Sequence, residues 1–400
     1  MKYCILITDG AAGWPLSNRG GKTCLELAHT PNLDALAQEG FLGLARTIPE
    51  GMEPSSGCAC MSIFGYNPRI YYRGRSGIEA KSMGIPVGDG EVIFRCNLVS
   101  VRGGKMRSYS AGFITTGEAK ALIAALNDGL GNDKVQFYPG VSYRHICKIK
   151  DREDTLLATY TPPQDIHGKH IDEFLPQGPG SDLLRDLMIR SEGVLRDHPV
   201  NRARRSRGDI PANMIWLFWS SGKTPDVPPF RLVYGVDAAI TSGVDLLRGL
   251  AKMVGMEVLN IPGVTGELDN DYTAQAKEAI QALKRHDMVI IHVEAPDEAG
   301  HAGSIKEKVK AIEKIDEEMV SRLRAWDKDG LRILVMPDHP TPIETQSHVR
   351  EPVPFMLWGP GFVANGTRRF TEAEAKSTGV FFEEGYDIMN RLIRRGKVCL

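Results

Sequence analysis

Three apolar segments of this 400-residue sequence lead into acidic residues, and this pattern restricts the possible folds more than any other feature. Residues 1–7 precede Asp9, residues 286–293 precede Asp297, and residues 334–336 precede Asp338. Short apolar runs bounded by turn-forming residues are typical of buried strands. Since open α/β sheets bind ligands at the carboxyl ends of their strands, we expect the three carboxylates to lie at one edge of a sheet.

Histidines accompany two of these carboxylates. His301 lies four residues after Asp297, so one helical turn would put both side chains on the same face. His339 follows Asp338 directly, and His348 lies in the same loop. A strand-ending Asp is often only a helix cap, and a single loop His is usually solvated. Capping requires no histidines, however, and a cluster of Asp and His is what two transition-metal ions need as ligands.

Ser56 is the candidate nucleophile. It lies in Ser55-Ser56-Gly57, ahead of an apolar segment, 58–64, that has the character of a helix. A hydroxyl at a helix N-terminus lies among unpaired amide donors, where an anion such as phosphate binds readily. The alternative is that Ser56 is only the N-cap of this helix. The sequence leaves both interpretations open.

Two kinds of region alternate along the chain. In 1–80 and 231–400, strands alternate with helices, including a long helix expected from Ser304 to Asp327, which predicts a mostly parallel sheet with helices on both faces. The segment 81–230 differs, because it contains a predicted hairpin about Gly103-Gly104 and further strands. We therefore expect a discontinuous α/β core and an inserted, smaller α+β domain.

The candidate substrate-binding residues lie in the expected insertion. A Pro- and Gly-rich loop, 161–181, carries polar side chains, and residues 202–207 include four arginines. Clustered arginines bind phosphate through paired donors, but they also form solvated helix faces. The residues selected as candidates are Asp165, Lys169, Asn201, Arg204 and Arg205.

Composition excludes several classes of function. The formal net charge is -1 and no long basic run is present, so we expect no nucleic-acid partner. No stretch is apolar enough to span a bilayer, so we expect no membrane partner. The first apolar run ends at Asp9, unlike a signal peptide, and the seven cysteines form no CxxC pair. We therefore expect a cytoplasmic protein, and its oligomeric state stays open.

Four motifs together resemble the alkaline phosphatase superfamily, and more closely its archaeal-type cofactor-independent phosphoglycerate mutases. They are ILITDG at 5–10, SIFGYNP at 62–68, PDEAGH at 296–301, and PDHPTP at 337–342 with His348. The resemblance covers nearly the whole chain and implies an alkaline-phosphatase-like fold. It also implies metal-dependent phosphoryl transfer through a phosphoserine at Ser56, interconverting 3-phosphoglycerate and 2-phosphoglycerate without bisphosphoglycerate.

The resemblance further implies two divalent metal ions, usually manganese and sometimes magnesium or zinc, and a small phosphorylated metabolite as substrate. One ion would be held by Asp297, His301 and His348. The other would be held by the residues Asp9, Ser56, Asp338 and His339.

A narrower likeness and several departures leave the substrate open. Residues 161–166, 198–201 and 211–216 are similar to a branch also proposed to be homoserine kinase. Gly57 and Cys60 stand where the family usually has an acidic residue and an Asn or His. The alternatives are therefore phosphoryl transfer to homoserine or another small hydroxyl metabolite, and a non-catalytic metal-binding protein.

Overall fold

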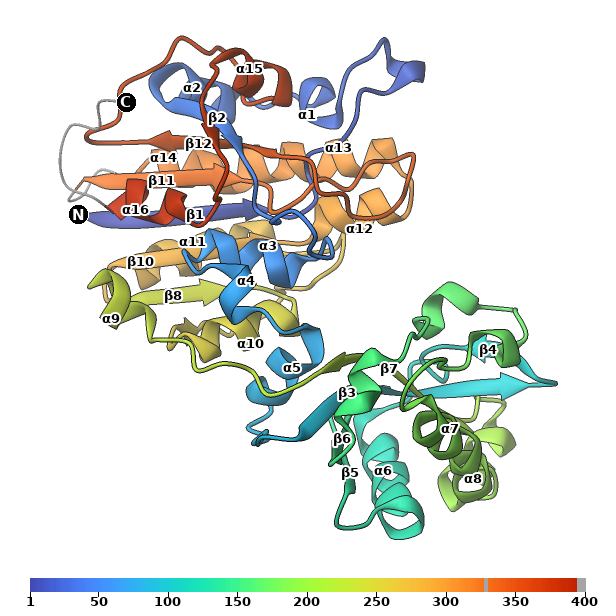
Figure 1. Cartoon of the computed structure of the whole chain (residues 1–400). Helices are drawn as coiled ribbons and strands as arrows, with labels where there is room; N and C mark the ends of the chain where they lie inside the picture. The colour runs from blue at the N-terminus through green and yellow to red at the C-terminus, as the bar shows by residue number, and fades with distance from the viewer. Residues whose placement is uncertain (327–329, 394–400) are drawn as a thin grey trace. The chain divides into compact units, whose positions relative to one another are not determined.

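The computed structural model describes residues 1–326 and 330–393, and the chain forms two compact units (Figure 1). The first unit consists of Met1–Tyr72 and Asp226–Leu400, and the second of Arg73–Pro225. We expected the insertion to cover 81–230. The second unit starts somewhat earlier than residue 81 and also ends somewhat earlier than residue 230. The reason is helix α5 (Arg75–Ser82), whose Glu79 forms a buried ion pair with Arg95 on β3 (Glu91–Arg102).

The first unit is built on an eight-stranded sheet with the order β13-β2-β12-β11-β1-β10-β8-β9. The strand bounds are β1 Lys2–Thr8, β2 Phe41–Ala45, β8 Ala238–Thr241, β9 Glu257–Val258, β10 Met288–Val293, β11 Leu331–Met336, β12 Val353–Trp358 and β13 Phe381–Phe382. β11, β1, β10, β8 and β9 run parallel, which confirms the expected α/β sheet. β12, which the sequence patterns did not single out, is antiparallel to both β11 and β2.

Helices cover both faces of this sheet, as expected. On one face, Cys4 and Leu6 of β1 share a core with α2, α11, α14 and the π-helical turn η5 (Ile315–Val320). On the other face, α10 contacts β8, and α16 contacts β11 and α3. The helix bounds are α1 Cys24–Leu27, α2 Pro31–Glu39, α3 Ser56–Ile63, α4 Pro68–Tyr71, α9 Phe230–Tyr234, α10 Asp245–Met253, α11 Tyr272–Ala282, α12 Ala295–His301, α13 Ile305–Lys314, α14 Ser321–Arg324, α15 Glu372–Ser377 and α16 Asp387–Ile393.

The long helix expected from Ser304 to Asp327 is interrupted. α13 passes into the π-helical turn η5 (Ile315–Val320) and then into α14, and Asp327 lies outside the described residues. The turn carries Asp316, a buried side chain whose carboxylate accepts the backbone N–H groups of Asn32 (3.2 Å) and Leu33 (2.6 Å) at the start of α2. None of the helices described here is long and apolar enough to cross a membrane.

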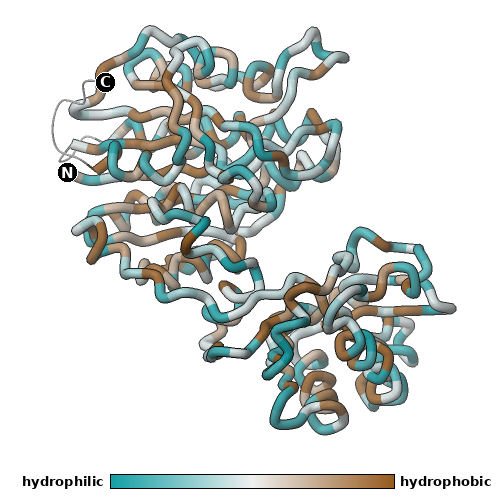
Figure 2. The backbone as a smooth tube through the Cα atoms, viewed as in Figure 1, coloured by the Kyte–Doolittle hydropathy of each residue, from teal (hydrophilic) through white to brown (hydrophobic). Residues whose placement is uncertain are grey.

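The second unit has an antiparallel sheet of five strands, which fits the expected α+β character. Besides β3 they are β4 Lys105–Ser108, β5 Val135–Tyr138, β6 Arg144–Lys150 and β7 Met214–Ser221, and the helices besides α5 are α6 Thr116–Leu130, α7 Ser181–Leu195 and α8 Pro199–Arg207. The hairpin about Gly103-Gly104 is confirmed, and both glycines have positive φ angles, of 58° and 71°. In each unit, Figure 2 shows hydrophobic residues concentrated along the strands.

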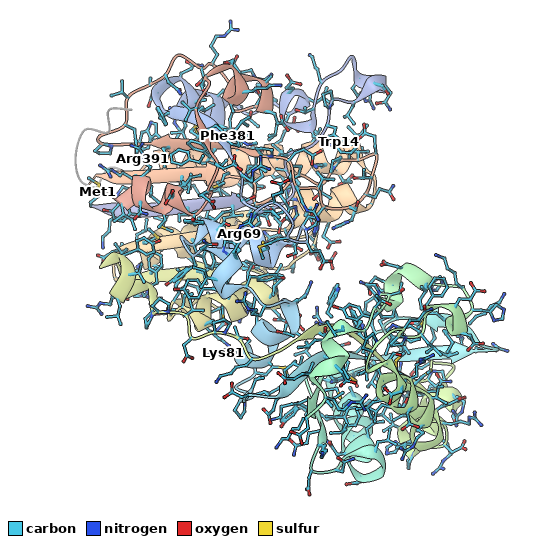
Figure 3. All side chains as sticks on the ribbon, viewed as in Figure 1. Met1, Trp14, Arg69, Lys81, Phe381 and Arg391 are labelled. Atoms are coloured by element: carbon cyan, nitrogen blue, oxygen red, sulfur yellow. The ribbon has the colours of Figure 1, made fainter. Side chains whose placement is uncertain are left out.

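In the first unit, hydrogen bonds connect the loop that follows β1 with the loop that follows β11. Trp14, labelled in Figure 3, follows β1, and its Nε1–H donates to Glu351 Oε1 at 3.1 Å. The backbone N–H of Thr341 donates to the carbonyl of Ala12 at 3.1 Å. The segments that follow β1 and β11 are therefore held side by side.

We predict that the buried Glu79–Arg95 pair is a main stabilising contact of the second unit. Burial alone would raise the pKa of Glu79, but Arg95 and Arg75 outweigh it and lower the pKa to about 2. The contribution of the pair is therefore complete above the ordinary pKa of the carboxyl and is lost as the pH falls toward 2. Glu79→Gln should lower the free energy of unfolding by about 3–5 kcal/mol at pH 7, because it leaves a buried charge unpaired.

Urea unfolding followed by circular dichroism checks this prediction. Glu192→Gln is the matched control, because Glu192 pairs with Arg196 on the surface of α7. An exposed pair is worth about 0–1 kcal/mol. Equal losses for the two variants would contradict the assigned role of Glu79.

Candidate metal centre

The candidate ligands meet because three adjacent strands end level with one another. β1 lies between β10 and β11, and Ile7 pairs with both His292 and Met336. Asp9 follows β1, α12 follows β10, and Asp338 and His339 follow β11. The expected meeting of carboxylates at one sheet edge is thus present, and the side chains form two groups.

The first group is Asp297, His301 and His348. Nε2 of His301 lies 3.1 Å, and Nε2 of His348 lies 3.4 Å, from Oδ2 of Asp297. The two Nε2 atoms are 2.9 Å apart. Nδ1 of His301 lies 2.8 Å from the carbonyl of Gln346 and donates to it, so its Nε2 is directed at the carboxylate. As expected, Asp297 and His301 lie one turn apart on α12.

The second group is Asp9, Asp338, His339 and Ser56. Nε2 of His339 has three oxygen neighbours, which are Ser56 Oγ at 3.2 Å, Asp338 Oδ2 at 3.3 Å and Asp9 Oδ1 at 3.6 Å. The two carboxylates and the imidazole are 0% exposed. Four side chains with ligand atoms of the kind that divalent ions prefer therefore converge in a buried position.

The structure excludes one of the two interpretations of Ser56. The N-cap of α3 is Ser55, whose Oγ accepts the backbone N–H of Cys58 at 3.3 Å. The N-cap alternative for Ser56 is therefore wrong, and its hydroxyl faces His339. Two further hydrogen bonds connect the last turn of α3 with the loop that carries His339. Ser62 Oγ donates to the carbonyl of Thr47, and Thr47 Oγ1 donates to the carbonyl of Asp338 at 2.6 Å.

Negative charge is crowded in this centre. Burial, and then the nearby Asp338, raise the pKa of Asp9 well above its usual value. Burial and Asp297 raise the pKa of Glu294 to about 8. Hydrogen bonding to Asp297 raises the pKa of His301 to about 9 although burial opposes this, whereas burial lowers the pKa of His339 to about 4. The first group thus attracts positive charge, and the second holds a neutral imidazole.

These observations fit divalent metal ions. Oδ1 of Asp9 is buried and has no hydrogen-bond partner among the described residues, although it is a carboxylate oxygen surrounded by other ligand atoms. Such an oxygen is costly to bury unless a cation neutralises it. Each group offers imidazole nitrogen and carboxylate oxygen within 4.8 Å, as a shared ion requires.

Close packing fixes the loops that carry the ligands. Gly10 has a φ angle of +60°, and a Cβ atom there would collide with Asp297. Oγ1 of Thr341 donates to Oδ1 of Asp297. Nζ of Lys308, a fully buried side chain, donates to the carbonyls of Ala12 (3.1 Å) and Thr341 (2.7 Å). One ammonium group therefore links the loop after Asp9 to the loop after His339.

Sequence reasoning missed three polar residues of this centre, two of them buried (His292 and Lys308) and one partly buried (Glu294). His292 and Glu294 flank the end of β10, and Lys308 lies on α13. His292 stands out as the histidine inside the apolar run 286–293, which was a usable signal. Lys308 gave none, because a lysine in an amphipathic helix is normally exposed.

Comparisons with known proteins agree with the motifs. A sequence profile described as 2,3-bisphosphoglycerate-independent phosphoglycerate mutase matches residues 37–201. Proteins of that name from Methanothrix thermoacetophila and Methanosarcina barkeri are 45% and 44% identical, over 98% of this chain and 100% of theirs. The chain belongs to the 2,3-bisphosphoglycerate-independent phosphoglycerate mutase family. The family resemblance expected from the motifs is therefore confirmed, whereas the narrower homoserine kinase likeness stays a prediction.

Solved structures extend this likeness to the fold. The PH0037 protein from Pyrococcus horikoshii is 28% identical and superimposes with a TM-score of 0.79, covering 98% of this chain and 96% of that one. A cofactor-independent phosphoglycerate mutase from Thermoplasma acidophilum has the same fold, with 23% identity, a TM-score of 0.63, and coverage of 98% and 99%. Both units of the chain thus follow the architecture of this family.

The candidate substrate-binding residues have two different environments. Asp165, Lys169 and Arg205 are exposed. Asn201 is fully buried and bonds the backbone of Leu195 and Ala212, contrary to the expected role in substrate binding.

The buried Arg204 differs from that expectation in the same way. Its guanidinium pairs with Glu118 (2.6 Å), and it also donates to the carbonyls of Ala111 and Ile210. Like Asn201, Arg204 uses its polar atoms to hold the second unit together.

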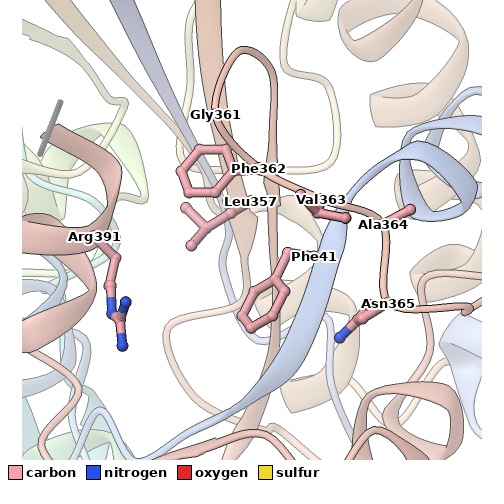
Figure 4. A pocket seen from close by; sticks show the side chains of 8 residues that line it. All are labelled: Phe41, Leu357, Gly361, Phe362, Val363, Ala364, Asn365 and Arg391. Carbon is pink, nitrogen blue, oxygen red and sulfur yellow. The ribbon is translucent and has the colours of Figure 1, made fainter. Parts of the chain in front are cut away.

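An apolar pocket of about 220 Å³ lies elsewhere in the first unit (Figure 4). Phe41, Leu357 and Phe362 line it, and Arg391 lies at its side. None of the candidate metal ligands lines this pocket, so it is separate from the centre.

We predict that Lys308→Met destabilises the protein and loosens the centre. Methionine has nearly the same length but no donor, so the carbonyls of Ala12 and Thr341 lose their shared partner. The free energy of unfolding should fall by about 2 kcal/mol or more, because each buried carbonyl without a donor costs about 1–3 kcal/mol. Thermal unfolding and Mn²⁺ affinity measure the two effects. The exposed Lys310 lies on the same helix, and a Lys310→Met variant that lost as much would contradict this assignment.

Proposed function

We propose that the chain interconverts 3-phosphoglycerate and 2-phosphoglycerate through a phosphoserine at Ser56, without bisphosphoglycerate. The observation that carries the proposal is the position of Ser56. Its hydroxyl lies in the first turn of a buried helix, 3.2 Å from His339 and within a group of buried carboxylates. This arrangement combines a nucleophile with ligands for charge-neutralising ions, which phosphate ester chemistry requires. The family relatives support the choice of substrate.

We assign two divalent ions to the centre, with manganese as the expected metal and magnesium or zinc as alternatives. Asp297, His301 and His348 would hold one ion. The ligands of the other would be Asp9, Ser56, Asp338 and His339. When bound, the ions neutralise charge on the phosphoryl group and increase the acidity of a hydroxyl group.

The residues of the chain define the two transfer steps. In the first, Ser56 Oγ loses its proton and forms a bond to phosphorus while the bond from phosphorus to the C3 oxygen breaks, and that oxygen takes up a proton. In the second, the C2 hydroxyl of the retained glycerate attacks the phosphoserine and loses its proton, and Ser56 Oγ leaves as the hydroxyl. The first-turn amides and dipole of α3 stabilise negative charge beside Ser56. Because the protein itself carries the phosphoryl group, no bisphosphoglycerate is needed.

We further propose that Met1–Tyr72 with Asp226–Leu400 form the metal-binding core and that Arg73–Pro225, the unit expected as 81–230, is a substrate-binding insertion. Asp165, Lys169 and Arg205 are the exposed polar residues we assign to the substrate, while Asn201 and Arg204 shape the surface that carries them. A cytoplasmic location is supported by the six cysteines in the described part of the chain, which are all free thiols.

Ser56→Ala tests the nucleophile. Turnover should fall by about 10⁴-fold or more, since removing a catalytic nucleophile costs at least this much. The phosphoserine, detected by mass spectrometry after a rapid quench, should disappear. Ser55→Ala is the matched control, because it removes the neighbouring hydroxyl, costs about 1 kcal/mol of stability through the lost cap, and keeps the phosphoserine. A phosphoserine that persists in Ser56→Ala would contradict the proposal.

A substrate screen tests the reaction. Metal-free protein supplied with Mn²⁺ should convert 3-phosphoglycerate to 2-phosphoglycerate in the absence of bisphosphoglycerate, as followed by phosphorus NMR. Removal of the metal with EDTA should stop the conversion, and added Mn²⁺ should restore it. No conversion by metal-loaded protein would rule out this substrate.

Parallel samples with homoserine and phosphoryl donors test the alternative of homoserine phosphorylation. Formation of phosphohomoserine would favour that reaction. A protein that binds Mn²⁺ but transfers no phosphoryl group would be a non-catalytic metal-binding relative.

A further inference from the structure

A short chain of hydrogen bonds connects the start of α10 with the carboxylate of Asp9. The backbone N–H of Val244 donates to Ser242 Oγ at 3.0 Å. Ser242 Oγ lies 3.0 Å from Nδ1 of His292, and Nε2 of the same ring lies 2.8 Å from Oδ2 of Asp9. Ser242 and His292 are 1% exposed and Asp9 is 0% exposed, so water does not compete for these contacts.

The direction of each bond follows from the partners. Since Val244 N–H occupies one lone pair of Ser242 Oγ, the hydroxyl proton is available for Nδ1 of His292. Nε2 faces Oδ2 of Asp9, and the ionised carboxylate of a metal ligand only accepts, so Nε2 carries the proton. The opposite tautomer would direct the Nε2 lone pair at Asp9. A hydroxyl that donates to Nδ1 and a carboxylate that accepts from Nε2 thus fit the same tautomer of His292.

We propose that His292 is a positioning residue for the metal ligand Asp9. Its Nε2–H holds Oδ2, which leaves Oδ1 as the free oxygen of the carboxylate. Oδ1 is the atom that faces His339 Nε2 at 3.6 Å and has no hydrogen-bond partner in the described residues. Partners behind a ligand typically change metal affinity about 10–100-fold when they are removed. The inference rests on the proposed metal centre, and it adds a residue that acts through Asp9.

A different role for His292 is as a metal ligand itself. His292, Asp9 and Glu294 have ligand atoms within 4.8 Å of one another. Both ring nitrogens of His292 already have partners, however, so binding an ion would require the ring to lose its bond to Ser242 or to Asp9. The two roles predict different stoichiometries, because loss of a ligand removes an ion, whereas loss of a positioning residue only weakens its binding.

Calorimetric titration of the metal-free full chain with Mn²⁺ tests the proposal. His292→Leu, which fills the space without a donor, should weaken the binding of one Mn²⁺ about 10–100-fold and keep the stoichiometry. His292→Gln retains an N–H group that reaches a carboxylate and should restore most of the affinity. Unchanged affinity in His292→Leu, the loss of one whole ion, or absence of Mn²⁺ binding by the unsubstituted chain would overturn the proposal.

His286→Gln is the matched control. His286 lies at the other end of the same strand segment, is 7% exposed, and its Nδ1 lies 2.6 Å from Oδ2 of Asp237. It is therefore also a buried histidine paired with an aspartate, and its substitution should leave Mn²⁺ binding unchanged. A loss of affinity equal to that of His292→Leu would show a general effect of histidine loss and overturn the specific role.

Nitrogen-15 NMR of the metal-free chain labelled at histidine provides a readout that does not depend on the Leu variant folding. The His292 signals, assigned by their absence in His292→Gln, should show a protonated Nε2 and an unprotonated Nδ1. A protonated Nδ1 together with an unprotonated Nε2 would overturn the proposal. A chain that shows the expected affinities and tautomer but does not convert phosphoglycerate would refute the proposed function alone.

Discussion

The repulsion between buried carboxylates at one sheet edge is the constraint on which the rest of the structure depends. Asp9, Asp297 and Asp338 come from the ends of three adjacent parallel strands, and all three are almost completely buried. Burial and mutual repulsion raise the pKa of Asp9 and of the neighbouring Glu294. Carboxylates packed so closely stay ionised only if positive charge is added. Binding of cations at this edge of the sheet is therefore favourable.

The protein supplies part of that positive charge and much of the rigidity from outside the ligand set. Lys308 holds the two ligand-bearing loops through their carbonyls, and its ammonium is near enough to Asp297 and Asp9 to interact with their charges. His292 holds the far oxygen of Asp9, and Thr341 holds the far oxygen of Asp297. Each ligand carboxylate thus has one oxygen fixed by the fold and one directed into the centre. This division of roles is how outer partners orient metal ligands.

The sequence predicted the candidate metal ligands better than the residues that hold these ligands in place. Asp9, Asp297 and Asp338 could be found because strand ends and apolar runs are local patterns, and His301 because i,i+4 spacing on a helix is local too. Lys308 could not be found, since its burial results from long-range packing of α13 on two loops. For the same reason Arg204 was expected to bind substrate, although its partners Glu118 and Ala111 are distant in sequence. The π-turn η5 depends likewise on a contact between Asp316 and α2.

The departures from the family pattern near Ser56 leave the ligand set complete. A Cβ atom at Gly57 would lie 2.9 Å from the ring of Tyr72 and 3.1 Å from its hydroxyl, so glycine is needed to seat this tyrosine against α3. The hydroxyl of Tyr72 lies 3.1 Å from Oγ of the capping residue Ser55, which anchors the first turn of the helix.

Cys60, the other departure, adds no negative charge to the centre. Burial, and then the nearby Asp338, raise the pKa of its thiol well above the usual value, so the thiol stays neutral beside the carboxylate. Its Sγ lies 3.8 Å from Oδ2 of Asp338 and acts as a weak donor to it. With Gly57 and Cys60 in place, Ser56 Oγ lies 3.2 Å from Nε2 of His339, and neither residue stands in for a candidate ligand. Both residues therefore act on the shape and polarity of the surroundings of Ser56, Gly57 by leaving room for Tyr72 and Cys60 by placing a neutral thiol beside Asp338.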